Sequence, residues 1–303
     1  MNHAALLAGI LAGEALLGYP RRWPHPVMAA GAIIASFERR WNRGGALRRR
    51  FAGVALLLLL VASSAMLGGA IEWAAWDFWG AFVIIAVGTT GLAQRSLHDH
   101  VAAVQARLSG ADLPGARAAV GMIVGRDTAT LDEAGIATAA VESLAESFCD
   151  GVVAPAFWFL LAGLPGLFAA KAINTADSMV GHRTDALRAF GAASARADDA
   201  INWVPARFAG LLICIAGRGG WWTMWRDARR HASPNGGWPE AAMAGVLHRQ
   251  LGGPVSYDGE PAMRATLGAG PAPVAADLAR ALGIYRAACI LLLLAAGALA
   301  WAL

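Results

Sequence analysis

Three acidic residues in the segment VESLAESFCDG are spaced four apart: Glu142, Glu146 and Asp150. On an α-helix this spacing places all three carboxylates on one face, where like charges repel each other. The segment runs into apolar sequence, and a partly buried group of anions is costly unless it is paired. We expect the pairing charge to come either from arginines such as Arg126 or Arg196, or from Mg²⁺, which takes one or two carboxylates together with substrate phosphates.

A second set of polar groups lies in KAINTADSM. Lys171, Asn174, Asp177 and Ser178 recur at helical spacing, so a cation, an amide, a carboxylate and a hydroxyl share one helix face. Lys171 is the only lysine among 25 basic residues, and its compact charge suits a phosphate. The alternative interpretation is a lysine that snorkels at a membrane edge.

Two later segments extend this pattern. SARADDAINWVPAR offers Arg196, Asp198, Asp199, Asn202 and Arg207, and its paired aspartates either cap a helix or bind a metal. Ten of the 21 acidic residues of the chain lie between residues 126 and 199, around an apolar segment. The acids therefore do more than cover a solvated surface.

Turn signals mark the remaining candidates. SPNGGWPEAAMAG contains Ser-Pro and Asn-Gly turns before Pro239 and Glu240, which we expect at a helix start. Backbone amides there could hold an anion, or the helix is simply capped. RRWPHPV places two prolines around His25 and precedes an amphipathic helix ending in arginines. By itself it indicates a membrane-surface loop.

The elements that must position these residues are membrane helices. The chain of 303 residues is 57% hydrophobic and 15% charged, whereas soluble domains carry about 25% charged residues. Its net charge of +4 lies in loops between apolar runs, which favours membrane topology over nucleic-acid binding. Four stretches could span a bilayer: 3–18, 53–71, 79–94 and 284–302.

Charge distribution predicts the orientation of these spans. The loop 19–52 holds eight arginines and one acid, which predicts a cytoplasmic loop, an external N-terminus and a cytoplasmic residue 95. The apolar segments 152–170 and 203–217 are interrupted by GLPG and by Pro205 and Arg207. We favour segments that dip into the membrane and return, and the alternative is that both cross.

The sequence thus predicts an all-α, polytopic membrane protein. We expect one domain over 1–303, with about four spanning helices, re-entrant or buried broken helices and cytoplasmic amphipathic helices. A cytoplasmic-face catalytic region should cover 95–283. Within it we expect an amphipathic helix in LHDHVAAVQARLS and a Pro-Gly turn at 114–115, and no strand-like alternation is found.

Six segments together resemble a known family, the adenosylcobinamide-phosphate synthases of cobalamin biosynthesis (the CobD/CbiB family). In chain order they are WPHPV, VGRDT, ESLAES…DGVVAP, KAINTADSMVG, FGAASARADDAINWVPARF and SPNGGWPEAAMAGVL…LGGP, over residues 14–260. The sequence departs from the family pattern at Ser147, where Asn is usual, and at His182, where Tyr is usual. Near the start, where the family tends to have Gly-Asp-Pro, Tyr19 separates Gly18 and Pro20.

The resemblance implies ATP- and Mg²⁺-dependent amide formation between adenosylcobyric acid and (R)-1-amino-2-propanol or its O-phosphate. On this basis we expect Lys171, Arg196 and Arg207 to stabilise phosphate oxygens and Asp199 to act as the base. The expected metal ligands are Glu142, Glu146, Asp150, Asp177 and Asp198. Further ligand contacts are expected from His25, Arg126, Asn174, Ser178, Asn202, Asn235, Trp238 and Glu240.

Other interpretations stay open at this point. A non-catalytic sensor or scaffold of the same fold, or a transporter, would also place polar residues around broken apolar segments. The expected location is the inner (cytoplasmic) membrane, with the active site facing the cytoplasm and lipid as a partner. The sequence leaves open whether the amine is phosphorylated. It also leaves open a homo-oligomer, or a complex with other late cobalamin-pathway enzymes.

Overall fold

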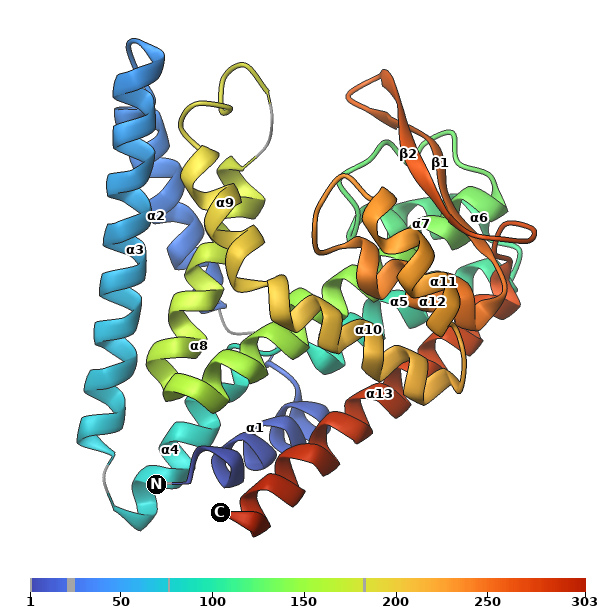
Figure 1. Cartoon of the computed structure of the whole chain (residues 1–303). Coiled ribbons are helices and arrows are strands. Elements are labelled where there is room, and N and C mark those ends of the chain that lie inside the picture. Colours follow the sequence, from blue (N-terminus) through green and yellow to red (C-terminus); the bar gives the residue numbers. More distant parts are fainter. Residues whose placement is uncertain (1, 21–24, 76, 182–183) are drawn as a thin grey trace. The chain divides into compact units, whose positions relative to one another are not determined.

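The computed structural model describes residues 2–20, 25–75, 77–181 and 184–303. Figure 1 shows a chain built almost entirely of helices, which confirms the predicted all-α class. The chain divides into two compact units. Unit 1 comprises residues 1–93, 154–202 and 296–303, and unit 2 comprises residues 94–153 and 203–295. Most predicted functional segments fall within one of these units, but SARADDAINWVPAR is divided after Asn202 and ESLAES…DGVVAP after Val153.

Unit 1 contains a long apolar helix, Ala46–Ala74, most of whose surface is exposed. Its elements are α1 (His3–Leu17), α2 (Pro26–Trp41), α3 (Ala46–Ala74), α4 (Phe78–Thr89), α8 (Ala154–Val180) and α9 (Ala192–Ile201). Figure 1 shows α3 running beside the second half of α8. Gly68 permits this close approach, because a Cβ there would lie 2.6 Å from the backbone carbon of Leu164. Leu56, Leu60, Ala176 and Phe190 form part of the core between these helices.

The break predicted in the apolar segment 152–170 is present in α8. Ala162 and Gly163 leave helical geometry, and Gly163 has φ +63°. Glu72, at the end of α3, accepts a hydrogen bond from the backbone N–H of Leu164 at 2.7 Å. A carboxylate thus caps the first free amide of the second half of α8, which stabilises a helix start that would otherwise leave a donor unpaired.

We expect Gly163→Ala to lower the free energy of unfolding by about 1–3 kcal/mol, because its backbone conformation is almost restricted to glycine. The added Cβ would also lie 2.2 Å from the Glu72 carboxylate oxygen and displace the cap. Thermal unfolding in detergent measures the effect. Gly297→Ala is the matched control, since nothing lies within 4 Å of a Cβ there. Equal unfolding temperatures for the two variants would contradict this account of the break.

Unit 2 is organised around one buried helix. Its elements are α5 (Gln94–Ser109), α6 (Leu113–Gly121), α7 (Glu133–Phe148), the π-helix η1 (Cys149–Val153), α10 (Trp203–Gly217), α11 (Trp221–Asp227), η2 (Ala228–Arg230), α12 (Gly237–Leu247), the strands β1 (Gln250–Tyr257) and β2 (Glu260–Gly268), and most of α13 (Ala275–Ala302). Every residue of α12 is buried, and α7, α10 and α11 pack around it.

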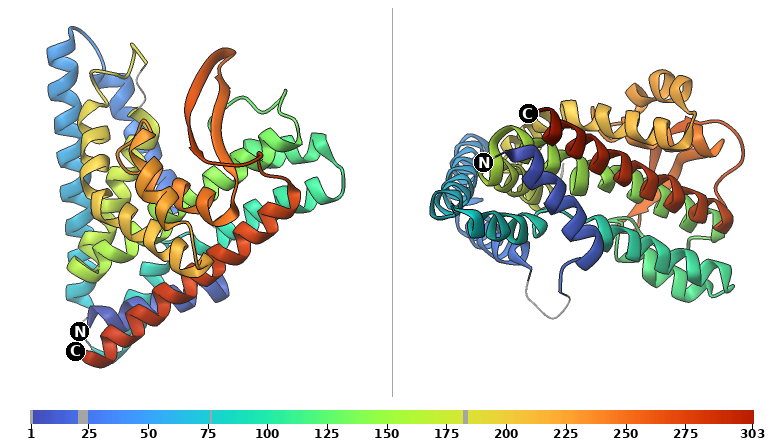
Figure 2. Two further views of the ribbon diagram at one scale, coloured as in Figure 1. Left: turned by 45° about the vertical axis from the view of Figure 1, so that its right-hand side comes forward. Right: turned by 90° about the horizontal axis from the view of Figure 1, so that it is seen from below.

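Three local predictions for unit 2 are wrong. The strands β1 and β2 form an antiparallel hairpin, which Figure 2 shows as a twisted ribbon, where only helix and loop were expected. Pro114 and Gly115 were expected in a loop turn between helices, but they lie in the first helical turn of α6, where proline is well tolerated. Asp150 lies in η1, where the i→i+5 pattern takes it out of α-helical register with Glu146.

Among the described residues, four stretches are long and apolar enough to cross a membrane: 46–74, 79–109, 133–180 and 275–302. They confirm the polytopic prediction and include three of the four predicted spans. The predicted span 3–18 is wrong, because α1 has 15 residues and is shorter than a bilayer requires. The exposed side chains of α3, such as Leu58, Leu59 and Met66, fit a lipid-facing surface.

Candidate functional site

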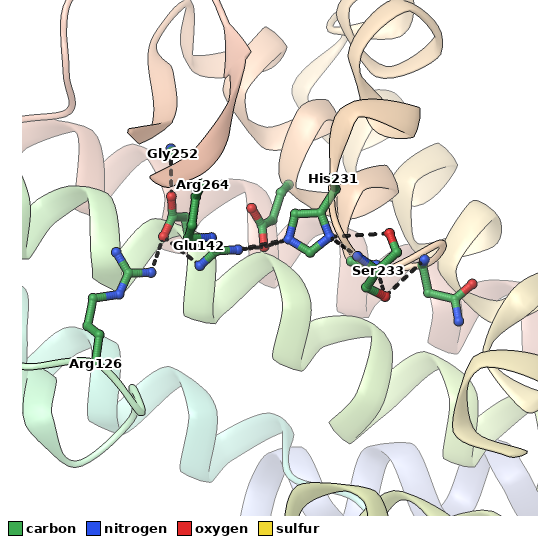
Figure 3. Close-up of polar contacts among 9 residues, drawn as sticks. Arg126, Glu142, His231, Ser233, Gly252 and Arg264 are labelled. Atoms are coloured by element: carbon green, nitrogen blue, oxygen red, sulfur yellow. Dashed lines mark hydrogen bonds and ion pairs between the residues drawn. The ribbon is translucent and has the colours of Figure 1, made fainter. Parts of the chain in front are cut away.

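A buried ionic network in unit 2 is centred on Glu142 of α7, shown in Figure 3. Its side chain is only 1% exposed. Both oxygens are engaged: Oε2 accepts from Arg126 and, at 3.1 Å, from Arg264 Nη1, and Oε1 accepts from the backbone N–H of Gly252 at 2.7 Å. Of the two pairings expected for this carboxylate, the structure shows arginine.

The hairpin supplies two of these three contacts. Gly252 lies on β1 and Arg264 on β2, and the tip of the hairpin is tied to the loop that carries Arg126. Asp127 Oδ2 accepts from Ser256 Oγ at 2.5 Å and from the backbone N–H of Gly259 at 2.9 Å. The hairpin and the VGRDT segment therefore hold their two arginines against the same carboxylate.

Arg264 also reaches a second buried carboxylate and a histidine. Its Nη2 lies 2.8 Å from Oε1 of Glu240 on α12 and 2.9 Å from Nε2 of His231. Because arginine only donates hydrogen bonds, His231 Nε2 is the acceptor in that contact. Its Nδ1 lies 3.1 Å from the backbone nitrogen of Ser233 and 3.3 Å from the carbonyl oxygen of the same residue. Burial lowers the pKa of His231, in agreement with a neutral ring.

Carboxylates outnumber guanidinium groups in this network. Glu142, Glu240 and the half-buried Glu146 interact electrostatically with Arg264. Arg126, which pairs with Glu142, is the second arginine that the described residues contribute to this network. Burial raises the pKa of Glu240 well above its usual range, opposed by Arg264 and reinforced by Glu146 and Glu142. The raised pKa favours the protonated form of Glu240, which reduces the excess negative charge.

This proton makes stability depend on pH. A carboxyl with a raised pKa binds its proton more tightly in the folded than in the unfolded protein. Its stabilising contribution is complete below the ordinary glutamate pKa of about 4.3 and is lost as pH rises through the raised value. We expect Glu240→Gln to be increasingly more stable than the native chain as pH rises through this window, measured by thermal unfolding at each pH. A constant difference between the two proteins would contradict the assignment.

A second polar cluster, in unit 1, is centred on Asp198 of α9. Asn202 Nδ2 donates to Asp198 Oδ2 at 3.0 Å, and Asn174 Nδ2 of α8 lies 3.4 Å from Oδ1. The charges of Asp177 and Asp199 also act on Asp198. The aspartate pair therefore does not cap a helix N-terminus, since it lies in the last turn of α9. Asn202 is 2% exposed, and its Oδ1 has no hydrogen-bond partner among the described residues.

The two clusters differ in how well they fit Mg²⁺. Glu142 does not fit, because both of its oxygens already accept from arginine or backbone groups. Asp198 and Asp177 fit better, because the two carboxylates interact electrostatically and Asp198 is hydrogen-bonded to Asn202, whose amide oxygen has no hydrogen-bond partner among the described residues. The described residues include no group of three or more His, Cys, Asp or Glu able to hold a metal. Mg²⁺ needs only one or two carboxylates when phosphates complete its shell.

The other predicted residues lie at diverse positions. His25 caps α2 through Nδ1, which accepts from the N–H of Val27 at 3.2 Å, and burial and the nearby Lys171 lower its pKa. Arg196 and Ser178 are exposed, and Asp150 is half-buried. Asn235 and Trp238 are buried at the start of α12. Ser147 is half-buried on α7, whereas His182 and residues 21–24 lie outside the described residues.

Sequence reasoning missed Arg264 and His231. His231 lies just before the Ser-Pro turn segment, and Arg264 lies on the second strand of a hairpin that no strand-like alternation indicated. The dipeptide Asp258-Gly259 is the signal in the sequence that could have indicated the hairpin. Asp258 and Gly259 form the turn between the strands, and Asp-Gly between apolar-containing runs is a strong hairpin signal.

Fold and site together define a polytopic helical membrane protein with two clusters of buried polar residues. A family model, CobD/Cbib protein, matches residues 6–285. The "Cobalamin biosynthesis protein CobD" of Rhodobacter capsulatus is 48% identical, covering 95% of this chain and 94% of its own. The proteins of that name from Geobacter metallireducens and Brucella anthropi are 44% and 47% identical, covering 97% and 80% of this chain and 95% and 79% of their own. No solved structure matches. The chain belongs to the CobD/Cbib family.

Proposed function

We propose that this protein acts in cobalamin biosynthesis as an ATP-dependent ligase. It would join adenosylcobyric acid to (R)-1-amino-2-propanol or its O-phosphate through an amide bond. The observation that carries the proposal is the Asp198 cluster, in which two amides orient a carboxylate beside a second carboxylate and an unpaired amide oxygen. Family membership supports the pathway and the corrinoid as the substrate class.

Amide formation requires activation of a carboxylate. In the proposed reaction the corrin propionate attacks the γ-phosphorus of ATP and ADP leaves. The amine nitrogen then displaces inorganic phosphate from the acyl phosphate. Such chemistry depends mainly on positioning and on neutralising phosphate charge.

The residues of unit 1 suit that task. Asp177, Asp198 and the Asn202 amide oxygen would hold Mg²⁺, which supplies charge neutralisation at the transferred phosphoryl group. Lys171, seven residues before Ser178 on α8, offers a point charge for phosphate oxygens. Asp199, half-buried next to Asp198, is our choice to take the proton that the amine releases.

The unit 2 network has a different role in this proposal. Its arginines are engaged by Glu142 and Glu240 and hold α7, α12 and the hairpin in fixed relation. Glu146, one turn further along the same helix, has a half-buried carboxylate. This carboxylate lies close to Gly236, since a Cβ added to that glycine would be 3.2 Å from its Oε1. The network thus fixes the position of Glu146 and of the segment SPNGGWPE, which we propose contacts the substrate.

The proposed location is the inner membrane with the site on the cytoplasmic side. Arginine-rich loops at 19–52 and 218–283 support that orientation, since basic loops stay in the cytoplasm.

Product analysis tests the function. The protein in lipid nanodiscs is given adenosylcobyric acid, Mg²⁺-ATP and each amine in turn, and products are identified by mass. The proposal predicts a corrinoid heavier by the amine minus water, and one ADP per amide, only when ATP is present. Corrinoid binding without a product under any of these conditions would favour a sensor, and corrinoid uptake into proteoliposomes would favour a transporter.

A further inference from the structure

The guanidinium of Arg207 lies between two tryptophan rings of unit 2. Its Cζ is 4.0 Å from the ring centroid of Trp203 and 4.6 Å from that of Trp238. Both distances are well within the range of a cation–π interaction. Trp225 of α11 completes this aromatic cluster: it packs edge-to-face on Trp238, with the ring centroids 5.0 Å apart and an interplanar angle of 88°.

Arg207 has no acidic partner among the described residues. Its one described hydrogen bond runs from Nη1 to the carbonyl oxygen of Trp203, although a guanidinium has five N–H donors. It is half-buried, and the charge of Arg229 also acts on it. The remaining donors of the planar guanidinium suit a carboxylate or phosphate.

The flanking aromatic surface is left uncovered. Trp203 is 53% exposed and Trp225 57% exposed, whereas Trp238 between them is buried. A tryptophan buries roughly 150–250 Å² when it is covered, so exposing two of them forgoes considerable stabilisation. A ligand that fits must combine a broad apolar body with an oxyanion at its edge.

We propose that Trp203, Arg207, Trp225 and Trp238 form a platform that binds the corrinoid, with Arg207 on its propionate carboxylate. This inference rests on the proposed function, which supplies the corrinoid as substrate. The macrocycle is broad and largely apolar on its faces, and its free carboxylate projects from the edge. A nucleotide base would cover a single indole, whereas here two exposed indoles lie on separate helices, α10 and α11.

Equilibrium dialysis with adenosylcobyric acid, without ATP or amine, tests the platform. We expect Trp203→Ala and Trp225→Ala each to weaken binding about 5- to 10-fold, in line with aromatic contact energies. Trp222→Ala is the matched control, because Trp222 lies on the same helix as Trp225, is 73% exposed and is outside this aromatic cluster. It should bind like the native chain.

The carboxylate contact has its own test. Arg207→Gln should weaken binding of adenosylcobyric acid about 10-fold or more, and Arg207→Lys should give an intermediate loss. With the corresponding corrinoid amide, which has no carboxylate at that position, the native chain and Arg207→Gln should bind equally. An equal loss for acid and amide would overturn the assignment of the carboxylate to Arg207.

The outcomes separate this inference from the proposed reaction. Native corrinoid affinity in the tryptophan variants would overturn the platform and leave the ligase proposal intact. Weakened ATP binding with unchanged corrinoid binding would show a nucleotide platform, and failure only to insert into nanodiscs would show a membrane anchor; both overturn the inference. Corrinoid binding that depends on these tryptophans, without any amide product, would support the platform and contradict the ligase.

Discussion

Replacing Arg264 by glutamine is expected to lower the free energy of unfolding by about 3–5 kcal/mol, the largest stability effect predicted for this chain. The guanidinium contacts Glu142 and Glu240, and each of these side chains is 1% exposed. Removing the cation leaves Glu142 with Arg126 as its one remaining cation among the described residues and takes from Glu240 its arginine partner, and water cannot reach either carboxyl group. Thermal or denaturant unfolding in detergent at neutral pH measures the loss.

A surface pair provides the control for Arg264. Arg107 and Asp112 lie 2.9 Å apart, almost the same distance as Arg264 and Glu240, but both are well exposed. Arg107→Gln should therefore cost less than about 1 kcal/mol. Adding Glu240→Gln to Arg264→Gln should restore part of the lost stability, because the buried Glu240 carboxyl must bind a proton to be neutral at neutral pH, whereas glutamine is neutral without one. Equal costs for the two arginine variants, or strictly additive effects in the double variant, would show that burial does not govern this network.

Asp198→Asn is expected to lower kcat/KM for amide formation at least about 100-fold, the usual cost of removing one preorganised electrostatic contact. The substitution keeps the size of the side chain and both neighbouring amides, so the expected loss comes from charge alone. The Mg²⁺ concentration for half-maximal activity should rise at the same time. Asn202→Ala, which removes the orienting amide, should cost about 10- to 100-fold.

Asp185→Asn is the matched control for Asp198, since Asp185 is an exposed aspartate of the same unit. It should retain full activity and an unchanged Mg²⁺ requirement. If Asp198→Asn were fully active, or inactive with an unaltered response to Mg²⁺, the Asp198 cluster would not be the metal site.

The sequence predicted the helical class, three of the spans and the break in α8, because apolar length and helix-breaking residues are local signals. It also predicted one metal site formed by Glu142, Glu146, Asp150, Asp177 and Asp198, with Asn174 and Asn202 as ligand contacts. The structure places Asn174 and Asn202 on Asp198 and places Glu142 in the arginine network of unit 2. The predicted roles of these residues in metal binding and catalysis stay predictions.

Other features depended on contacts that no local pattern encodes. Glu142 was expected with Mg²⁺ or arginine, and the choice depended on a hairpin more than 100 residues away that carries Arg264. Asp150 left the helix face because a π-helix follows α7, and spacing alone cannot distinguish an i+4 from an i+5 ladder. Glu72 caps the second half of α8 from a position 92 residues earlier in the chain.

Oxygen transfer tests the central claim, that the protein activates a carboxylate with ATP, most directly. Adenosylcobyric acid labelled with ¹⁸O in its free carboxylate is converted to the amide, and the released phosphate is examined by mass. Phosphorylation of the carboxylate predicts one ¹⁸O in the inorganic phosphate for each amide formed. Unlabelled phosphate, or label found in AMP, would contradict it.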